Sequence, residues 1–376
     1  VGGAGAGNNV AGALRMGAKK VTAVEIDPAI LELGRKMHPS EPYGSASVRL
    51  VNTDIRSFQR LCGEKFDLIE YGILDSHTAL SSLSSLRLDN YVYTVESIRD
   101  AVGRLEPDGI MCVSFYESAR HWLGRRIYGA ISRAAGRPPV TTKFNQTAYF
   151  LFGPGVDPAK VKARIGKLGL PVMDDFYSAE EVKPATDDWP FLYSNPNGQP
   201  WVYYASLLFI VAAGTGATWL ALRSGRAAAG VRMDWQMFFL GAGFLLIETK
   251  ALAELSLLFG STWVVNTFVF AGIFVMVLGA NLAVSAGAGR HVRAAYFLLA
   301  ASLLVWFFFS RAQLSVLPFA TRALAGTFMV VLPLFFAGVI FASSFAGRED
   351  TNVAFGSNLI GAVVGGAAPI RFDPNA

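Results

Sequence analysis

The first nine residues are rich in glycine, and they stand before an alternation of helix and strand patterns. Val1-Gly2-Gly3-Ala4-Gly5-Ala6-Gly7-Asn8-Asn9 precedes a helix-like run, Val10–Gly17, and a strand-like run that ends in acids, Val21–Asp27. Glycine lets a backbone approach a ligand closely, and the N-terminus of the next helix favours negative charge. A carboxylate at the tip of the second strand can accept hydrogen bonds from ribose hydroxyls. This order of elements predicts a nucleotide-binding α/β unit in which Glu25 holds the ribose.

The glycine spacing distinguishes this loop from the common dinucleotide-binding fingerprint. In G-x-G-x-x-G, Gly3 and Gly5 would need a third glycine at position 8, where Asn8 stands. The cluster, followed by Val24-Glu25-Ile26-Asp27-Pro28, resembles the spermidine synthases (aminopropyltransferases) of the S-adenosylmethionine-dependent methyltransferase superfamily. The resemblance implies a Rossmann-like, doubly wound α/β sheet of the class I methyltransferase type. It also implies S-adenosylmethionine or decarboxylated S-adenosylmethionine as co-substrate and no metal, with Gly3, Gly5 and Gly7 near its methionine-derived part.

Motifs farther along the chain extend the resemblance to about residue 115. A strand-like run, Phe66–Tyr71, is followed by Gly72-Ile73-Leu74-Asp75-Ser76-His77-Thr78, and strand ends are where this fold places its chemistry. Aligned with the family's Y-D-V-I-I-x-D-S-S-D, Asp75 takes the position of the proposed base, and Gly72 replaces the first aspartate of D-S-S-D. Val92–Glu96 and Leu105–Gly109 resemble the family's L-Y-T-x-E-F and L-K-P-G-G.

The residues around that strand end are the candidates for catalysis. The resemblance implies that Asp75 removes a proton from an attacking amine, which is nucleophilic only when neutral. His77 is the alternative base, since its unperturbed pKa lies nearer neutrality. Asp75 could instead only cap the turn at Ser76-His77. Glu70 and Asp89 are candidates for attracting a cationic amine.

Another candidate contact to the nucleotide follows the short strand Val48–Val51. In the resembled family an aspartate here contacts the adenine amine and the next residue packs on the ring, which gives these roles to Asp54 and Ile55. Asp54 could instead cap the helix that follows it, a common role for Asp. The sequence leaves both interpretations open.

The chain becomes strongly apolar beyond about residue 200. It is 52% hydrophobic with a mean hydropathy of +0.38, which is too apolar for one soluble domain. We therefore expect a nucleotide-binding domain over 1–155, a small helix with an acidic and aromatic linker over 156–200, and an all-α transmembrane helix bundle over 201–376. The expected spans are 201–222, 235–258, 263–285, 294–310, 323–345 and 353–369.

The apolar part carries motifs of its own. Phe244-Leu245-Leu246-Ile247-Glu248-Thr249-Lys250, Phe259-Gly260-Ser261-Thr262-Trp263 and Ala354-Phe355-Gly356-Ser357-Asn358 resemble the membrane region of bacterial polytopic spermidine synthase-like proteins. The resemblance implies an integral protein of the bacterial inner membrane, in contact with the lipid bilayer. Because Val1 has no methionine before it and the sixth span breaks off, we expect the sequence to be a fragment.

Charges in this part leave two questions open. Lys250 and Glu254 stand four residues apart beside Glu248, so they form either an internal ion pair or a polar site within the membrane. The arginines between the expected spans, counted by the positive-inside rule, place the first domain outside the cell. A cytosolic co-substrate favours the cytoplasm instead, and we expect a cytoplasmic first domain.

Three functions fit these patterns. The first is a membrane-bound transferase that moves an aminopropyl group from decarboxylated S-adenosylmethionine to a small amine. The second is a methyltransferase for a lipid-like or other membrane substrate, which Gly72 and the apolar part favour. The third is a non-catalytic nucleotide-sensing domain on a transporter-like bundle. With a net charge of +5 and arginines that suit membrane flanks, we expect no nucleic-acid partner, and a homodimer is the one assembly that we consider.

Overall fold

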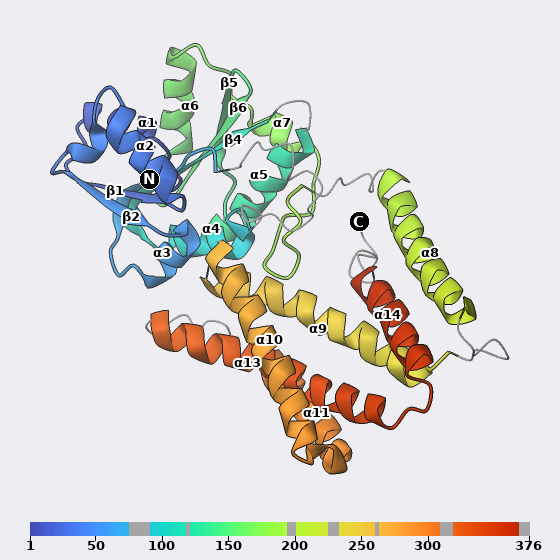
Figure 1. Cartoon of the computed structure of the whole chain (residues 1–376). Coiled ribbons are helices and arrows are strands. Elements are labelled where there is room, and N and C mark those ends of the chain that lie inside the picture. Colours follow the sequence, from blue (N-terminus) through green and yellow to red (C-terminus); the bar gives the residue numbers. More distant parts are fainter. Residues whose placement is uncertain are drawn as a thin grey trace. The chain divides into compact units, whose positions relative to one another are not determined.

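Figure 1 shows the computed structural model of the chain, which describes residues 1–74, 91–117, 121–193, 201–224, 233–259, 263–308 and 319–367. The chain forms two compact units, Val1–Pro196 and Asn197–Ala376. Three predicted site residues, Asp75, His77 and Asp89, lie outside the described residues.

Two pairs of parallel strands form the larger part of the sheet in the first unit. β1 (Val21–Glu25) pairs with β2 (Val48–Asn52), and β3 (Phe66–Tyr71) pairs with β4 (Leu105–Tyr116). The alternation of buried and exposed residues is weak in these strands because helices can cover a parallel sheet on both faces.

Gly2 joins the two pairs of strands. It forms parallel bridges to Val24 on β1 and to Tyr71 on β3. The Gly2 amide donates to the Glu70 carbonyl oxygen at 2.7 Å, and the Val24 amide donates to the Val1 carbonyl oxygen at 2.9 Å. The first residues of the chain therefore lie between β1 and β3, and the glycine loop begins at the middle of the sheet.

An antiparallel hairpin completes the sheet. β5 (Val140–Phe144) and β6 (Thr147–Phe152) pair with each other, and β6 pairs with β4. Between them Asn145 has a φ of 53°, a left-handed value that Asn tolerates in tight turns. The strand order is thus β2–β1–Gly2–β3–β4–β6–β5. The order reverses between β1 and β3, so the first unit is the doubly wound, Rossmann-like sheet that the sequence predicts.

Helices lie on both faces of this sheet, as Figure 1 shows. α1 (Asn8–Arg15) and α2 (Pro28–Met37) lie on one face, and α3 (Ile55–Leu61), α4 (Val95–Val102) and α5 (His121–Ala135) lie on the other.

Side chains that follow a strand or loop cap three of these helices. Such a cap satisfies one of the amides that have no partner within a helix. The caps are Asp27 to the Ala29 amide at 2.8 Å, Asp54 to the Ser57 amide at 2.9 Å and Thr94 to the Ser97 amide at 3.2 Å.

The main hydrophobic core lies between the sheet and the helices α4 and α5. Many of its fully buried members come from alternate positions of β4 and β6 and from the inner faces of the two helices: Met111, Val113, Phe115, Phe150, Ile98, Ile127 and Ile131. A smaller cluster on the other face packs α1 and α2 against β1 and includes Val10, Ala23, Leu31 and Tyr43. Both clusters include residues of β1, the strand that ends at Glu25.

The segment that follows the hairpin folds back onto the first unit. It contains α6 (Pro158–Lys167) and α7 (Asp174–Ser178) and then an irregular stretch up to Tyr193. The buried guanidinium of Arg126 on α5 donates to the carbonyl oxygens of Lys183 at 2.9 Å and of Phe191 and Leu192 at 2.7 Å. The aromatic stretch expected as a linker is therefore packed against α5.

One strand boundary differs from the prediction. The pattern predicts the fifth strand from Ile110 to Phe115, whereas β4 begins at Leu105. Phe66 pairs with Leu105 and Leu68 pairs with Ile110, so the register shifts between these pairs. Five residues of β4 therefore span two residues of β3, and the Pro-Asp-Gly sequence that reads as a turn is a bulge within the strand.

The described residues of the second unit form mainly helices. They are α8 (Trp201–Ser224), α9 (Trp235–Phe259), α10 (Trp263–Ser285), α11 (Val292–Phe308), α13 (Phe319–Ala346) and α14 (Thr351–Ala367), with a 3₁₀ turn, η4 (Ala288–His291), before α11. Within the described part, two segments are long and apolar enough to cross a membrane, Ala288–Phe308 and Leu324–Ala346. Tyr204–Ala217 and Phe270–Ser285 are apolar but shorter. Length and composition thus support two of the six predicted spans.

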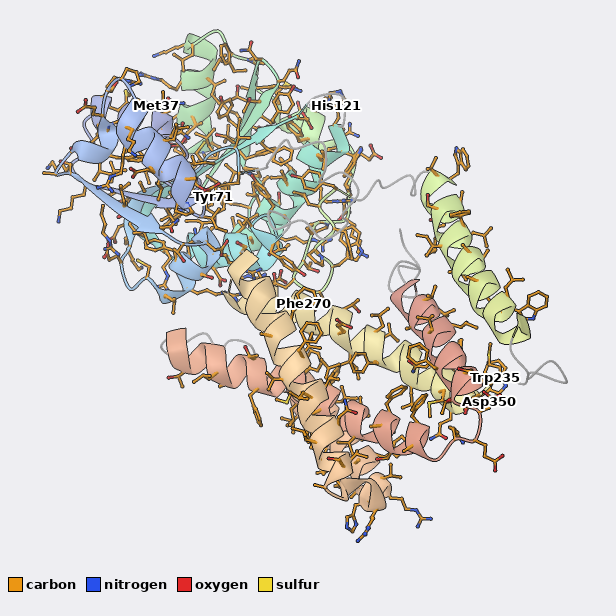
Figure 2. The ribbon with its side chains drawn as sticks, viewed as in Figure 1. Met37, Tyr71, His121, Trp235, Phe270 and Asp350 are labelled. Carbon is orange, nitrogen blue, oxygen red and sulfur yellow. The ribbon has the colours of Figure 1, made fainter. Side chains whose placement is uncertain are left out.

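α9 and α14 run side by side at very close range. A Cβ atom added at Gly361 would lie 1.9 Å from the Phe238 carbonyl oxygen, and one at Gly365 would lie 2.4 Å from the Ala242 carbonyl oxygen. Gly361 and Gly365 form a G-x-x-x-G pair, the pattern that lets helix backbones approach each other. Figure 2 shows Trp235 and Asp350 together where the two helices begin.

Candidate functional site

The glycine loop crosses the sheet where the strand order reverses. Gly3, Gly5 and Gly7 have φ values of 67°, 54° and 107°, which residues other than glycine rarely adopt. A Cβ atom at Gly3 would also lie 2.0 Å from Cδ2 of Leu74. In open α/β sheets, ligands bind in the crevice at this point. The three predicted loop glycines therefore share one wall of the candidate site.

Glu25 ends β1 directly beside the loop. Its Oε2 accepts from the Gly5 amide at 2.8 Å, and its Oε1 accepts from the Ile26 amide at 2.9 Å and the Asp27 amide at 3.0 Å. The side chain is only 8% exposed. The structure thus brings Glu25 to the glycine loop, as a ribose-binding carboxylate requires. It also gives Glu25 a second role, because the carboxylate holds the loop backbone.

Asp54 and Ile55 follow β2 at the same edge of the sheet. Asp54 caps α3, so the capping interpretation of this residue holds, and burial raises the pKa of its carboxyl. Ile55 is buried, and its Cγ1 would lie 2.8 Å from a Cβ atom at Gly2. Ile55 therefore packs under the start of the glycine loop. Their contacts to adenine stay predictions.

Glu70 lies on β3 and faces α1. Its Oε1 accepts from Nδ2 of Asn9 at 3.0 Å. Burial raises the pKa of Glu70. Cys112 is its partner on β4, and burial, with the charge of Glu70, raises the pKa of the thiol to about 12. Cys112 is thus a neutral thiol at physiological pH and lacks the thiolate that a nucleophile needs.

Gly72 directly follows β3 and lies against the glycine loop. Its amide donates to the Gly2 carbonyl oxygen at 3.1 Å. A Cβ atom here would lie 3.1 Å from Nδ2 of Asn9 and 3.3 Å from the Gly3 carbonyl oxygen. An aspartate, which the resembled family has at this position, would require these neighbours to move.

Tyr71, which precedes Gly72, is fully buried inside the first unit, as Figure 2 shows. Its hydroxyl donates to Oε1 of Gln59 at 2.8 Å. The polypeptide that carries Asp75 and His77 continues from Leu74, and Leu74 contacts Gly3. Leu74, the last described residue before them, therefore lies against the glycine loop. The roles of Asp75, His77 and Asp89 stay predictions.

Sequence reasoning missed two residues that shape this site. Asn9 bonds Glu70, and Tyr43 donates to the carbonyl oxygens of Ala4 at 3.1 Å and Gly5 at 2.6 Å. The turn η1 (Pro42–Gly44) carries Tyr43. Only its Pro-Tyr-Gly sequence, a turn signal, marks this position in the sequence.

Metal ligands do not gather in the described part. Among the residues placed there, no group of three or more His, Cys, Asp or Glu side chains could hold a metal ion.

Comparisons with known proteins point to one class of enzyme. No family model matches the chain. The polyamine aminopropyltransferase of Korarchaeum cryptofilum (strain OPF8) is 28% identical in an alignment of 203 residues that covers 46% of this chain and 60% of the relative. The chain is similar to polyamine aminopropyltransferases, at low identity and over about half of its length. It spans about 60% of the length of this curated relative.

Two solved structures are also similar to the chain. One is a spermidine synthase in complex with the transition-state analogue AdoDATO, and the other is the spermidine synthase from Thermotoga maritima. Each is 20% identical and covers 52% of this chain, with 63% and 64% of the other chain covered and TM-scores of 0.34 and 0.35.

Proposed function

We propose that the first unit transfers an aminopropyl group from decarboxylated S-adenosylmethionine to a small amine. The contact between Glu25 and the Gly5 amide carries the proposal, because it joins the ribose-binding carboxylate to the glycine loop at the sheet's switch point. The similarity to a polyamine aminopropyltransferase supports aminopropyl transfer as the reaction.

The reaction needs a neutral amine beside the sulfonium. The amine nitrogen attacks the aminopropyl carbon that is bonded to sulfur. The C–N bond forms as the C–S bond breaks, and the sulfur keeps the electron pair and leaves as a neutral thioether nucleoside. The proton of the amine passes to a base, for which Asp75 is our candidate and His77 the alternative. Glu70 and Asp89 are the candidates for attracting the amine as a cation.

We also propose that the second unit anchors the protein in a membrane, with the bacterial inner membrane as the site and the first unit in the cytoplasm. Among the described residues, two helices are long and apolar enough to cross a bilayer, and they support the anchor. The cytoplasmic side follows from the co-substrate, which is cytosolic.

Methyl transfer from S-adenosylmethionine is the second candidate. Gly72 favours it, because the resembled amine-binding enzymes carry an aspartate there, and even a Cβ atom at this position would lie 3.1 Å from Nδ2 of Asn9 and 3.3 Å from the Gly3 carbonyl oxygen. An apolar acceptor would reach the first unit from the membrane. A non-catalytic nucleotide sensor is the third candidate, and it predicts binding without turnover.

The identity of the bound nucleotide separates these candidates. We expect decarboxylated S-adenosylmethionine to raise the thermal midpoint of the intact protein in detergent more than S-adenosylmethionine does. A ligand at 100 times its Kd stabilises the folded state by about 2.7 kcal/mol. A larger shift with S-adenosylmethionine would instead favour methyl transfer, and no shift with either nucleotide would contradict the proposal.

Turnover of two variants tests the base. Asp75→Asn keeps the size of the side chain but removes the base, so we expect turnover to fall by about 10²–10⁴-fold with little change in nucleotide affinity. His77→Ala should retain most of the activity. Full turnover in Asp75→Asn, with loss in His77→Ala, would transfer the role to His77 and weaken the aminopropyl proposal.

A further inference from the structure

Tyr43 reaches the glycine loop from a distant part of the chain. Its side chain is 6% exposed, and its hydroxyl lies 2.6 Å from the Gly5 carbonyl oxygen and 3.1 Å from the Ala4 carbonyl oxygen. A tyrosine hydroxyl has one proton, so the two carbonyls share one donor. Tyr43 stands 38 residues from Gly5 in the sequence.

Tyr43 and Glu25 hold the same peptide unit from its two ends. In the peptide that joins Ala4 to Gly5, the carbonyl accepts from Tyr43 and the amide donates to Glu25 at 2.8 Å. The carbonyl and the amide of a planar trans peptide point in opposite directions. Rotation of this peptide would therefore break both contacts at once, and each contact fixes the geometry of the other.

The ring of Tyr43 is fixed as well. A Cβ atom at Gly34 would lie 2.8 Å from Cε2 of Tyr43 and 2.5 Å from the Ala6 carbonyl oxygen. A Cβ atom at Gly7 would lie 3.4 Å from Cζ of Tyr43. The ring is thus packed between α2 and the loop. Burial, and the nearby charge of Glu25, raise the pKa of Tyr43 to about 12, so the hydroxyl keeps its proton at physiological pH.

We propose that Tyr43 is a positioning residue, which holds the Ala4–Gly5 peptide and through it the carboxylate of Glu25 in the arrangement that receives the ribose of the nucleotide. The role of Tyr43 in nucleotide binding rests on the function proposed above, whereas its role in ordering the loop rests on the contacts of Tyr43 and Glu25 with the loop backbone. Glycines at positions 3, 5 and 7 give the loop many accessible conformations, and Tyr43 selects one of them. A loop that is already ordered loses less entropy when the ligand binds.

Two substitutions separate the hydroxyl from the ring. Tyr43→Phe removes only the hydroxyl and keeps the ring between Gly7 and Gly34. Tyr177→Phe is the matched control, because Tyr177 is also buried and donates its hydroxyl to Oε2 of Glu117 at 2.8 Å, far from the loop in sequence. Both variants lose one buried hydroxyl, so a general loss of stability affects them alike.

The first measurement is hydrogen exchange of the loop amides in the full chain, resolved to single residues by mass spectrometry with fragmentation. We expect the Gly5 amide to exchange about tenfold faster in Tyr43→Phe, the effect of losing about one hydrogen bond. Tyr177→Phe should leave Gly5 unchanged. Equal exchange in Tyr43→Phe and in the unmodified chain would overturn the proposal, as would the same acceleration in both variants.

The second measurement is the affinity for decarboxylated S-adenosylmethionine by calorimetry, with KM and kcat wherever turnover is detected. Tyr43→Phe should raise Kd and KM about tenfold and leave kcat unchanged, whereas Tyr177→Phe should leave all three unchanged. A fall in kcat at constant KM would contradict a positioning role. If the unmodified chain binds no sulfonium nucleotide, the proposed function fails, while the exchange of Gly5 still decides whether Tyr43 holds the loop.

Discussion

Glu25 holds the backbone of the glycine loop and, in our proposal, also the ribose, so one substitution tests both roles. Glu25→Ala removes the partner of the Gly5, Ile26 and Asp27 amides as well as the proposed ribose contact. We expect nucleotide binding to weaken by about 1–3 kcal/mol, the scale of hydrogen bonds to a charged group. Calorimetry gives the affinity and thermal unfolding gives the stability. Glu32→Ala, on an exposed face of α2, is the control. Unchanged affinity in Glu25→Ala would remove Glu25 from the nucleotide site.

Single residues also show how far the sequence can predict a site like this one. The glycine loop and Glu25 are close in sequence, and the order of strand, loop and helix was enough to predict that they meet. Tyr43 was not predictable, because its contact with Gly5 depends on how α2 and η1 return to the loop. No local pattern encodes such a contact. The Asn9–Glu70 contact spans 61 residues and was missed for the same reason.

At the scale of elements, a buried ion pair fixes the stretch between the hairpin and the second unit. Nη2 of Arg56 on α3 lies 2.5 Å from Oδ2 of Asp187, with the two side chains 4% and 13% exposed. Oδ1 of Asp187 accepts from the Thr94 hydroxyl at 2.9 Å, and the Asp187 amide donates to Oε2 of Glu96 at 2.9 Å. The pair thus ties this stretch to α3 and to the start of α4.

Removing one partner of this ion pair should destabilise the first unit more than replacing both partners together. Arg56→Met leaves Asp187 with only the more distant Arg60, whose Nη2 lies 3.8 Å from its Oδ2. Asp187→Asn leaves the buried Arg56 without its carboxylate. We expect Asp187→Asn to lower the free energy of unfolding by about 3–5 kcal/mol, and Arg56→Met by less. The double variant should lose less than the sum of the two, because neither charge then remains unpaired. Denaturant unfolding measures this cycle. Strictly additive losses would show that the two side chains are not coupled.

The close packing of α9 against α14 can be tested with a matched control, because α9 also contains a glycine with open space around it, Gly243. A Cβ atom at Gly361 would lie 1.9 Å from the Phe238 carbonyl oxygen, whereas one at Gly243 on α9 would meet nothing within 4 Å. Gly361→Ala should therefore force α9 and α14 apart and lower the thermal midpoint in detergent. Gly243→Ala should be neutral or stabilising, since alanine favours a helix by about 1 kcal/mol over glycine. A stabilised Gly361→Ala would contradict this close packing.

The types of most elements were predictable from pattern, but one boundary was not. The runs 140–144 and 147–152, joined by the short turn Asn145-Gln146, predict a hairpin, and the structure has it as β5 and β6. The predicted start of β4, Ile110, is wrong. Pro107-Asp108-Gly109 is a strong turn signal, but Phe66 pairs with Leu105, so the strand begins before that sequence. Tertiary pairing decides such cases, and a local pattern carries no information about the partner strand.

At the scale of the whole molecule, the change in composition near residue 200 predicted a second, helical part, and helices fill 201–224 and most of the described residues beyond. The orientation that the count of arginines favours conflicts with the cytoplasmic first unit that we propose. Arg290 lies in η4 and Arg293 in the first turn of α11, while Arg348 pairs with Asp234 at 2.8 Å and so counts for less as a free positive charge. A tally of arginines by sequence alone treats these residues as equal, although their environments differ.

Apolar side chains on the outside of the second unit lead to the last prediction. Phe274, Phe297 and Phe307 are 70%, 73% and 82% exposed. Each would face water in plain buffer, where burying such a side chain is worth about 1.5–3 kcal/mol. We therefore expect the full chain to sediment with membranes, to resist extraction by salt and alkaline carbonate, and to dissolve in detergent. A chain that ends at Tyr193 should stay in the supernatant. A full chain that is monodisperse in buffer without detergent would disprove the membrane anchor, because its exposed phenylalanines would then need protein partners instead of lipid.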